Sequence, residues 1–399
     1  MGDRKLSIGQ WFLVIIIASL VPAISLWMGY QFLLEKNERK EEAVDLLVYA
    51  PENTSLALPV SRNSGEITLY EFSPELREAY IYDIVVDGEQ LWIGTGKGLL
   101  AFAEGHYANL YRQFSRAPFE WINNLALEND LLALDTLVAT GSTGGHYAGS
   151  HIFNTQSKEW HRLGKNILDQ TWLNGSLWQR PLDRTLVKYT TDKNGTWIQE
   201  EIPIQGRLCS EAYMSAINNE IWIAQQGTVH FHGGAGINYA GSQVKALPCG
   251  VLRYNPETGE ETLYEESDGL NSGFGRDVAG DEHQVWVSHS IKYDKLSLFD
   301  PVTGQWQSAR PYGSGNRIAL SKKAVWLASP SSSDPLIRID RTTQKRKNIQ
   351  GIPKDFYVSA IAIDSENVWV GLYKKNWKDS TYTITSYLAR YIDNEVTRN

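Results

Sequence analysis

The stretch Leu91–Leu100 reads LWIGTGKGLL and follows an apolar run with three glycines and a lysine. A phosphate-binding loop would need Gly at the position of Leu91 and Ser or Thr at the position of Gly98. The dinucleotide-binding fingerprint would need a third glycine where Leu99 stands. Neither motif is complete, so we interpret the glycines as a tight turn between two strands. We predict no nucleotide site.

The apolar-Trp-apolar core of this stretch recurs along the chain and decides the fold. Six copies contain Trp, and Leu132 takes its place in a degenerate seventh copy. Neighbouring copies lie 40 to 46 residues apart, except for one interval of 64 that we attribute to an insertion. Short strands with polar turns at this period are typical of propeller blades. The sequence therefore predicts an all-β, seven-bladed β-propeller whose repeated Trp residues lie in the core, namely Trp92, Trp178, Trp222, Trp286, Trp326 and Trp369.

A second similarity within the chain predicts how the ring closes. Residues 64–73, SGEITLYEFS, resemble residues 258–267, TGEETLYEES, which form the last strand of one unit. The seventh unit ends near residue 394 and leaves little room for its own outermost strand. We predict that the propeller comprises residues 61–399 and that residues 65–72 complete its last blade. This arrangement removes exposed sheet edges.

The N-terminal region predicts a membrane anchor. Residues 11–34, WFLVIIIASLVPAISLWMGYQFLL, carry no charge and exceed the roughly 20 residues that a membrane-spanning helix needs. A cleaved signal peptide ending near Ala23 is the alternative, but the apolar run continues beyond that point. We predict a short tail at residues 1–10, a single transmembrane helix at 11–34, and a charged juxtamembrane stalk or linker at 35–60.

Charge and topology set the expected location. The net charge of −8 and the sequence pI near 5.6 argue against a nucleic-acid-binding protein, which would need a basic face. A short tail before a start-type anchor favours a cytoplasmic N-terminus and an exported C-terminal body. We therefore expect a single-pass protein of the bacterial inner membrane, with the propeller on the periplasmic side.

Several segments resemble the two-component regulator propeller repeats of bacteria. The resemblance rests on Tyr264–Leu270 (YEESDGL), ValAlaGlyAsp at 278–281, ValTrpVal at 285–287, and LeuTrpIleGlyThr at 91–95 with GlyLeuLeu at 98–100. It implies a seven-bladed propeller of the kind that usually forms an extracytoplasmic ligand-sensing module. In that family a linker domain and a histidine kinase follow the propeller. The repeats here run almost to residue 399, so we expect no kinase activity from this chain.

Long loops between the second and third strands predict a binding surface on one face of the ring. They lie at residues 140–151, 230–242 and 373–378. Such loops carry function on a rigid scaffold, although neutral variation in loop length would give the same pattern. His230 and His232 could point to one side of a strand, but no third ligand stands at a suitable spacing. We predict neither a metal nor another cofactor.

The first residues of the innermost strands are expected around the mouth of the central channel. Mixed polar and aromatic groups there suit a sugar, a peptide or a small anion, although solvation of a wet channel end explains them equally well. Cys209 and Cys249 either pair in an oxidising compartment or are small buried apolar residues. The candidates for the ligand- or partner-binding face are Tyr82, Asn123, His146, Tyr147, Gln170, Glu211, His232, Tyr239, Arg276, Arg317 and Tyr357.

Three functions are compatible with these features. The leading hypothesis is a membrane-anchored binding or assembly module that presents its loop-rich face to a protein or glycan. A second is a propeller lyase or hydrolase acting on a saccharide or peptide, with Glu211, Arg276 and His232 as its acid–base groups. A third is a sensor domain that works with a separate signalling partner.

Overall fold

The computed structural model describes residues 60–393 of the chain, except for gaps at 65, 73, 104–105, 110–119, 140–144, 164–166, 182–184, 207, 210–211, 227, 232–243, 290–294, 312–316, 330, 365–366 and 379–380. The predicted transmembrane helix and the predicted linker up to residue 59 lie outside these residues. Within the described part, no helix has the length and apolar character needed to span a bilayer.

The first four blades are four-stranded antiparallel sheets. Blade 4 carries an additional two-stranded hairpin, β17 (Thr228–Phe231) with β18 (Val244–Leu247), which accounts for the long interval in the repeat. The strands, from the innermost outward, are β3 (Ile81–Asp87), β4 (Gln90–Thr95), β5 (Gly98–Ala103) and β6 (His106–Asn109) in blade 1; β7 (Glu120–Glu128), β8 (Leu131–Ala139), β9 (Gly145–Asn154) and β10 (Trp160–Arg162) in blade 2; β11 (Ile167–Leu173), β12 (Ser176–Pro181), β13 (Thr185–Thr191) and β14 (Trp197–Pro203) in blade 3; and β15 (Ala212–Ile217), β16 (Glu220–Gln225), β19 (Val251–Tyr254) and β20 (Glu261–Tyr264) in blade 4.

Blades 5 and 6 repeat this plan, and blade 7 combines strands from both ends of the propeller. A short 3-10 helix, η3 (Glu266–Asp268), precedes blade 5, and α2 (Pro74–Arg77) precedes β3. The strands are β21 (Gly275–Gly280), β22 (Val285–His289), β23 (Lys295–Asp300) and β24 (Gln305–Pro311) in blade 5; β25 (Arg317–Leu320), β26 (Ala324–Ala328), β27 (Leu336–Asp340) and β28 (Arg346–Asn348) in blade 6; and β29 (Tyr357–Ile363), β30 (Asn367–Lys378), β31 (Thr381–Ile392), β2 (Ile67–Glu71) and β1 (Val60–Ser64) in blade 7.

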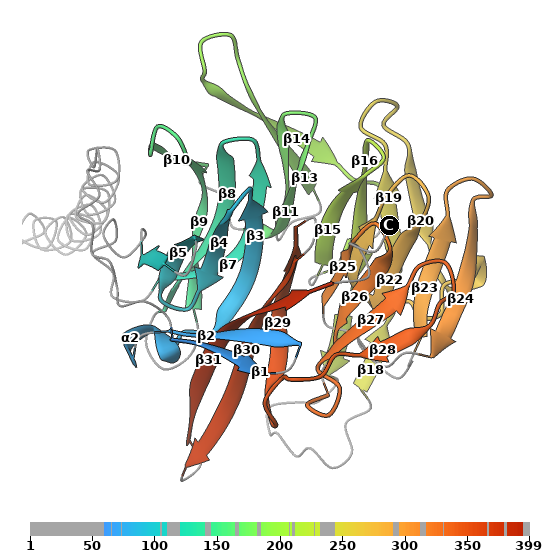
Figure 1. Ribbon diagram of the computed structural model, residues 1–399. Coiled ribbons are helices and arrows are strands. Elements are labelled where there is room, and N and C mark those ends of the chain that lie inside the picture. Colours follow the sequence, from blue (N-terminus) through green and yellow to red (C-terminus); the bar gives the residue numbers. More distant parts are fainter. Residues whose placement is uncertain are drawn as a thin grey trace, which may run out of the picture. The chain divides into compact units, whose positions relative to one another are not determined.

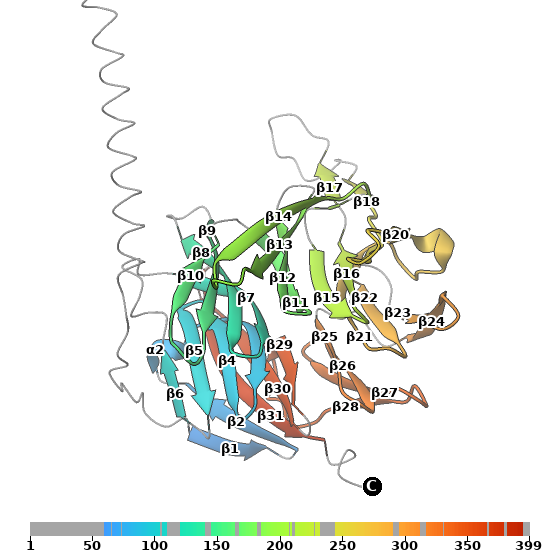
Figure 2. The ribbon, with the colours of Figure 1, turned by 90° about the horizontal axis from the view of Figure 1, so that it is seen from above.

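The seven innermost strands form a closed ring, so the predicted seven-bladed propeller is confirmed. Each innermost strand contacts those of its two neighbours, and β29 of blade 7 contacts β3 of blade 1. Figure 2 shows these strands gathered around the middle of the ring. Strand β2 pairs with β31 from Ile67 opposite Tyr391 to Glu71 opposite Tyr387, and β1 adds a fifth strand outside it. The two ends of the propeller are thereby joined in one sheet (Figure 1).

The repeated Trp residues form the core between blades, as predicted. Trp92 is 1% exposed and packs with residues of blade 2, including Ile122 and Phe153. Its indole N–H donates to the carboxylate of Asp87, the last residue of the preceding strand β3, at 3.2 Å. Trp369 makes the same contact with Asp364. Burial of a large aromatic ring with its polar atom satisfied is favourable, so Trp92 and Trp369 each stabilise one blade–blade contact.

The glycines of LWIGTGKGLL now have a physical explanation. A Cβ atom on Gly94 would lie 2.9 Å from the carbonyl oxygen of Ile122 in the next blade, closer than real Cβ contacts. Gly98 begins β5 with φ of 114°, in a region that favours glycine. The glycines permit close packing and a tight turn, and β5 rather than a helix follows them.

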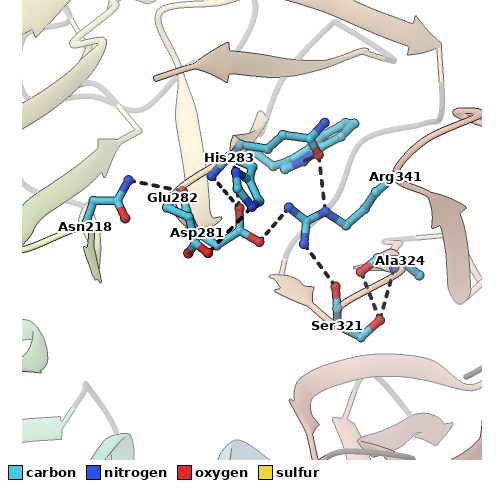
Figure 3. A network of polar contacts seen from close by, with 9 residues as sticks. Asn218, Asp281, Glu282, His283, Ser321, Ala324 and Arg341 are labelled. Carbon is cyan, nitrogen blue, oxygen red and sulfur yellow. Dashed lines mark hydrogen bonds and ion pairs between the residues drawn. The ribbon is translucent and has the colours of Figure 1, made fainter. Parts of the chain in front are cut away.

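On the face where the first-to-second and third-to-fourth strand turns emerge, Arg341 joins blades 5 and 6. Its guanidinium forms an ion pair with Asp281 at 2.6 Å and donates to the side chain of Gln284 at 3.2 Å. It also donates to the carbonyl oxygen of Ser321 at 3.3 Å. Figure 3 shows these contacts converging on the one side chain. This charge-assisted network connects turns of blades 5 and 6.

Candidate ligand-binding face

The opposite face of the ring carries the second-to-third strand turns and the first residues of the innermost strands. In blade 1, Ile81 at the start of β3 pairs with Thr95 at the end of β4. The N–H of Gly96 in the following turn donates to the carbonyl oxygen of Tyr80 at 2.9 Å. The equivalent positions of the other blades lie on the same side, because all innermost strands run in the same direction. We call this side the loop face.

Five aromatic side chains from three adjacent blades meet on the loop face. Tyr80 and Tyr82 have ring centroids 4.7 Å apart, and Tyr80 lies 4.8 Å from Tyr373. Tyr82 stacks on Trp121 of blade 2 at 6.3 Å, and Tyr373 lies 5.5 Å from Tyr357 in blade 7. All five are half-buried, so each keeps part of its ring accessible. We call these residues the aromatic cluster.

Three tyrosines of the cluster, Tyr80, Tyr82 and Tyr373, remain neutral over the physiological pH range. Burial raises the pKa of Tyr82, with a further contribution from Tyr382. Burial also raises the pKa of Tyr373 and of Tyr80. A neutral phenol both donates and accepts hydrogen bonds. The cluster therefore offers apolar ring surface together with hydroxyl groups.

Arg317 of blade 6 reaches the middle of the ring. Its guanidinium carbon lies 4.6 Å from the ring centroid of Tyr213 in blade 4, and it donates to the carbonyl oxygen of Tyr82 in blade 1 at 3.4 Å. Arg276 of blade 5 lies on the same tyrosine, at 5.4 Å, and donates to Gln226. Both distances fall in the range of cation–π attraction. Tyr213 is thus contacted by two guanidinium groups.

Three aspartates surround Arg317 and connect neighbouring blades. The carboxylate of Asp83 accepts the backbone N–H of Leu125 in the next blade at 2.8 Å. In the same way, Asp169 accepts from the N–H of Met214 and Asp277 from the N–H of Ile318. Since each carboxylate is bonded to the backbone of an adjacent blade, we assign these aspartates a structural role.

The pKa values of the three aspartates are set by burial against Arg317. Burial raises the pKa of Asp169 to about 7 and of Asp277 to about 6, and it also raises the pKa of Asp83. The charge of Arg317 acts in the opposite direction on all three. One guanidinium therefore keeps carboxylates ionisable in a poorly solvated environment.

Four of the residues predicted for the binding face lie together at the starts of innermost strands. They are Tyr82, Arg276, Arg317 and Tyr357. Asn123 lies further along β7 and is half-buried. Gln170 is buried in β11, where its amide accepts from Gln179 at 3.0 Å and donates to the carbonyl oxygen of Asn124 at 3.3 Å. Its amide thus bonds to neighbouring strands.

The remaining predicted residues lie outside what the structure describes. His146 and Tyr147 belong to β9, but only their backbone is described. Glu211, His232 and Tyr239 fall in gaps. Of the three residues suggested for acid–base chemistry, only Arg276 is therefore placed. Within the described ranges, no group of three or more His, Cys, Asp or Glu side chains is arranged to hold a metal ion.

The sequence reasoning missed Tyr80, Trp121, Tyr213 and Tyr373. Trp121 and Tyr213 each lie two positions from a residue that was predicted, Asn123 and Glu211. Tyr80 lies two positions before Tyr82. An aromatic residue near the start of an innermost strand in several blades was the signal that could have identified them.

Cys209 and Cys249 form a disulfide within blade 4, with their Cα atoms 6.4 Å apart. Buried Gln225 lies between the two strand ends that the bond joins. Its side-chain oxygen accepts the N–H of Cys209 at 2.8 Å, and its amide donates to the carbonyl oxygen of Cys249 at 3.3 Å. The disulfide thus fixes the base of the chain segment that contains the β17–β18 hairpin.

Comparisons with known proteins agree with the architecture. No protein-family model matches the chain, and no curated protein matches it. Among solved structures, the extracellular domain of the one-component system BT4673 from B. thetaiotaomicron is 15% identical with a TM-score of 0.53, and the match covers 81% of this chain and 40% of that one. YCF48 from Cyanidioschyzon merolae is 12% identical with a TM-score of 0.51, covering 82% of this chain and 99% of that one. YCF48 bound to D1 peptide is 13% identical with a TM-score of 0.51, covering 84% and 98%.

These similarities show a shared fold alone. The chain matches well under half the length of the BT4673 domain and nearly the whole length of YCF48. At identities of 12 to 15%, shared architecture carries no residue-level assignment. The chain is a seven-bladed β-propeller that resembles, among others, the extracellular domain of a bacterial one-component system.

Proposed function

We propose that this protein is a membrane-anchored, extracytoplasmic binding module that holds a glycan or a segment of another protein on its loop face. The observation that carries the proposal is the aromatic cluster, in which three blades contribute accessible rings to one surface. Such rings offer large contact area at low conformational cost, and their hydroxyls bond to polar ligands.

Three observations outside the cluster support the location and the mode of action. A disulfide between Cys209 and Cys249 persists in an oxidising compartment, in agreement with an exported propeller. One propeller of similar fold, YCF48, has been solved with a bound peptide. The aspartates near the ring centre are bonded to backbone amides, which favours recognition over acid–base catalysis at this position.

A thermal-shift screen of the full-length protein in detergent against glycans and peptides tests the proposal. A ligand at about 100 times its Kd adds about 2.7 kcal/mol to stability, which a melting curve detects. The screen is repeated with Trp121→Ala and Tyr373→Ala. Trp197→Ala is the matched control, because Trp197 is also half-buried but begins β14, on the side opposite to the loop face.

The proposal predicts ligands that shift wild type and the Trp197 variant but not the cluster variants. A shift that survives both cluster substitutions would place the ligand elsewhere and contradict the proposal. A flat screen on folded wild-type protein would contradict small-ligand binding and direct attention to large protein partners.

A further inference from the structure

Blade 7 extends into a two-stranded ribbon that the rest of the sheet does not cover. The pairing of β30 with β29 begins at Tyr373, and the pairing of β31 with β2 begins at Tyr387. Beyond these residues, Lys374–Lys378 and Thr381–Thr385 pair only with each other among the described strands. Five residues of a strand correspond to roughly 17 Å. Figure 1 shows this hairpin, in dark red, reaching past the other strands of its blade.

The end of the ribbon carries the most accessible aromatic residues of the described chain. Trp377 is 69% exposed and Tyr382 is 48% exposed, and no other aromatic side chain there is comparably exposed. The two residues pair directly across the ribbon, with ring centroids 5.0 Å apart. The amino group of Lys375 lies 5.1 Å from the ring centroid of Tyr382. Lys374 and Lys375 place positive charge beside these rings within a protein of net charge −8, and the amino group of Lys374 also forms an ion pair with Asp355 at 3.4 Å.

The register of β1 shows on which side the chain joins the propeller. Val60 at the start of β1 lies opposite Glu71, and Glu71 lies opposite Tyr387. From Tyr387 the strand β31 continues toward the ribbon tip at Thr381. Val60, the first residue of β1, therefore lies at the end of blade 7 from which the ribbon projects.

We propose that the tip of the β30–β31 ribbon contacts the surface of a lipid bilayer rich in anionic headgroups. Trp and Tyr rings prefer the headgroup region of membranes, where an amphipathic ring is partly dehydrated. Lysines near an anionic surface are attracted to it. Trp377 and Tyr382 supply the first property, and the adjacent lysines supply the second.

Area favours a lipid surface over a protein partner. Two aromatic side chains bury on the order of 400 Å² together. A stable protein interface needs about 800 Å² from each partner. A membrane contact can be smaller, because it adds to the attachment that a transmembrane anchor already supplies. The inference depends on the predicted anchor but not on ligand binding at the aromatic cluster.

Fluorescence quenching by brominated lipids tests the contact. The full-length protein is reconstituted into vesicles of phosphatidylethanolamine and phosphatidylglycerol, with bromine placed near the headgroups. The quenched emission of wild type is compared with that of Trp377→Phe. The matched control is Trp197→Phe, which removes a half-buried Trp on the opposite face.

The quenched emission is expected to fall in Trp377→Phe and to stay unchanged in the control. In Lys374→Gln/Lys375→Gln, the quenching of Trp377 is expected to weaken, as it should in wild type when phosphatidylglycerol is omitted. Equal quenching of wild type and Trp377→Phe would overturn the proposal. If Trp377 is protected from aqueous acrylamide in native membranes but is not quenched in vesicles that contain no other protein, the result would overturn the proposal in favour of a protein partner.

Discussion

Arg317 lies over the ring of Tyr213, with its guanidinium carbon 4.6 Å from the ring centroid, although the two residues belong to blades 6 and 4. The same guanidinium reaches the carbonyl oxygen of Tyr82 in blade 1. A single side chain thereby connects three blades that are not neighbours in the ring, and its charge offsets that of the aspartates around it.

Replacing this cation should destabilise the ring. In Arg317→Gln the carboxylates of Asp83 and Asp277 lose the charge that lowers their pKa, so ionising them costs more. Removing one partner from a buried charge group typically costs about 3 kcal/mol. Urea unfolding measures the loss, and Arg346→Gln, which removes an exposed ion pair with Asp334, should cost below about 1 kcal/mol. Equal losses in the two variants would argue against a central role for Arg317.

The stability contributed by the buried carboxyl groups should fall as pH rises from about 4 to about 8, whereas His151 and His289, whose pKa values burial lowers to about 4, act in the opposite direction below about pH 6. Burial raises the pKa of Asp135 to about 8 and of Asp169 to about 7, both well above the value in an unfolded chain. In that window the folded protein holds protons that the unfolded chain has released, so increasing pH favours unfolding. The stability that each carboxyl group contributes is fully present below its pKa in the unfolded chain. It is lost once the pH exceeds the pKa of the group in the folded protein.

Asp135→Asn isolates one part of this effect, because an amide cannot ionise. Asp135 is fully buried in β8, and the variant keeps its shape. The unfolding free energy of the variant should depend less on pH, by about 1 kcal/mol per unit between about pH 5 and about pH 7. Denaturation midpoints across this range provide the measurement. An unchanged slope would mean that Asp135 is ionised in the native state.

Two glycines of LWIGTGKGLL should respond differently to alanine. A Cβ on Gly94 would meet the carbonyl oxygen of Ile122 at 2.9 Å, whereas a Cβ on Gly96 would have its nearest neighbour at 3.7 Å. We expect Gly94→Ala to cost about 1–3 kcal/mol through overpacking and Gly96→Ala to be close to neutral. Melting temperatures compare the pair. If both are tolerated, the contact between blades 1 and 2 is looser than the structure indicates.

Removing the disulfide should weaken blade 4. The bond joins residues 40 positions apart, and disulfides that close loops of this size contribute about 2–4 kcal/mol. Cys209→Ser/Cys249→Ser should therefore unfold at lower urea concentration than wild type, and wild type treated with reductant should match the variant. A variant as stable as the oxidised protein would show that Gln225 and the surrounding core hold the segment without the bond.

The architecture was predictable because a Trp recurs at a fixed position in the second strand of six of the seven blades. Trp92, Trp286 and Trp369 pack into equivalent contacts between neighbouring blades. The spacing of these residues in the sequence therefore predicts the number of blades. The strand at Ile67–Glu71 was predictable for the same reason, since its sequence repeats that of another outer strand.

The residues of the loop face were harder to predict because the innermost strands are irregular. The pairing of β7 with β8 shifts between Ile122 and Leu125, and that of β3 with β4 shifts between Ile81 and Asp83. A bulge changes which side chain points to the ring centre. In blade 2 the alignment of the repeats predicted Asn123 for the loop face, whereas Trp121 belongs to the aromatic cluster. Residues 373–378 were predicted as a long loop, but the structure continues β30 through Lys378 and pairs it with β31.

A direct titration tests the binding function most clearly. A glycan or peptide that stabilises the protein is titrated calorimetrically into wild type, Trp121→Ala and Trp197→Ala, each checked for folding by its melting curve. The account predicts at least about tenfold weaker binding to Trp121→Ala, a loss of about 1.4 kcal/mol, and unchanged affinity in Trp197→Ala. Equal affinity of all three proteins would contradict the assignment of the ligand site to the aromatic cluster.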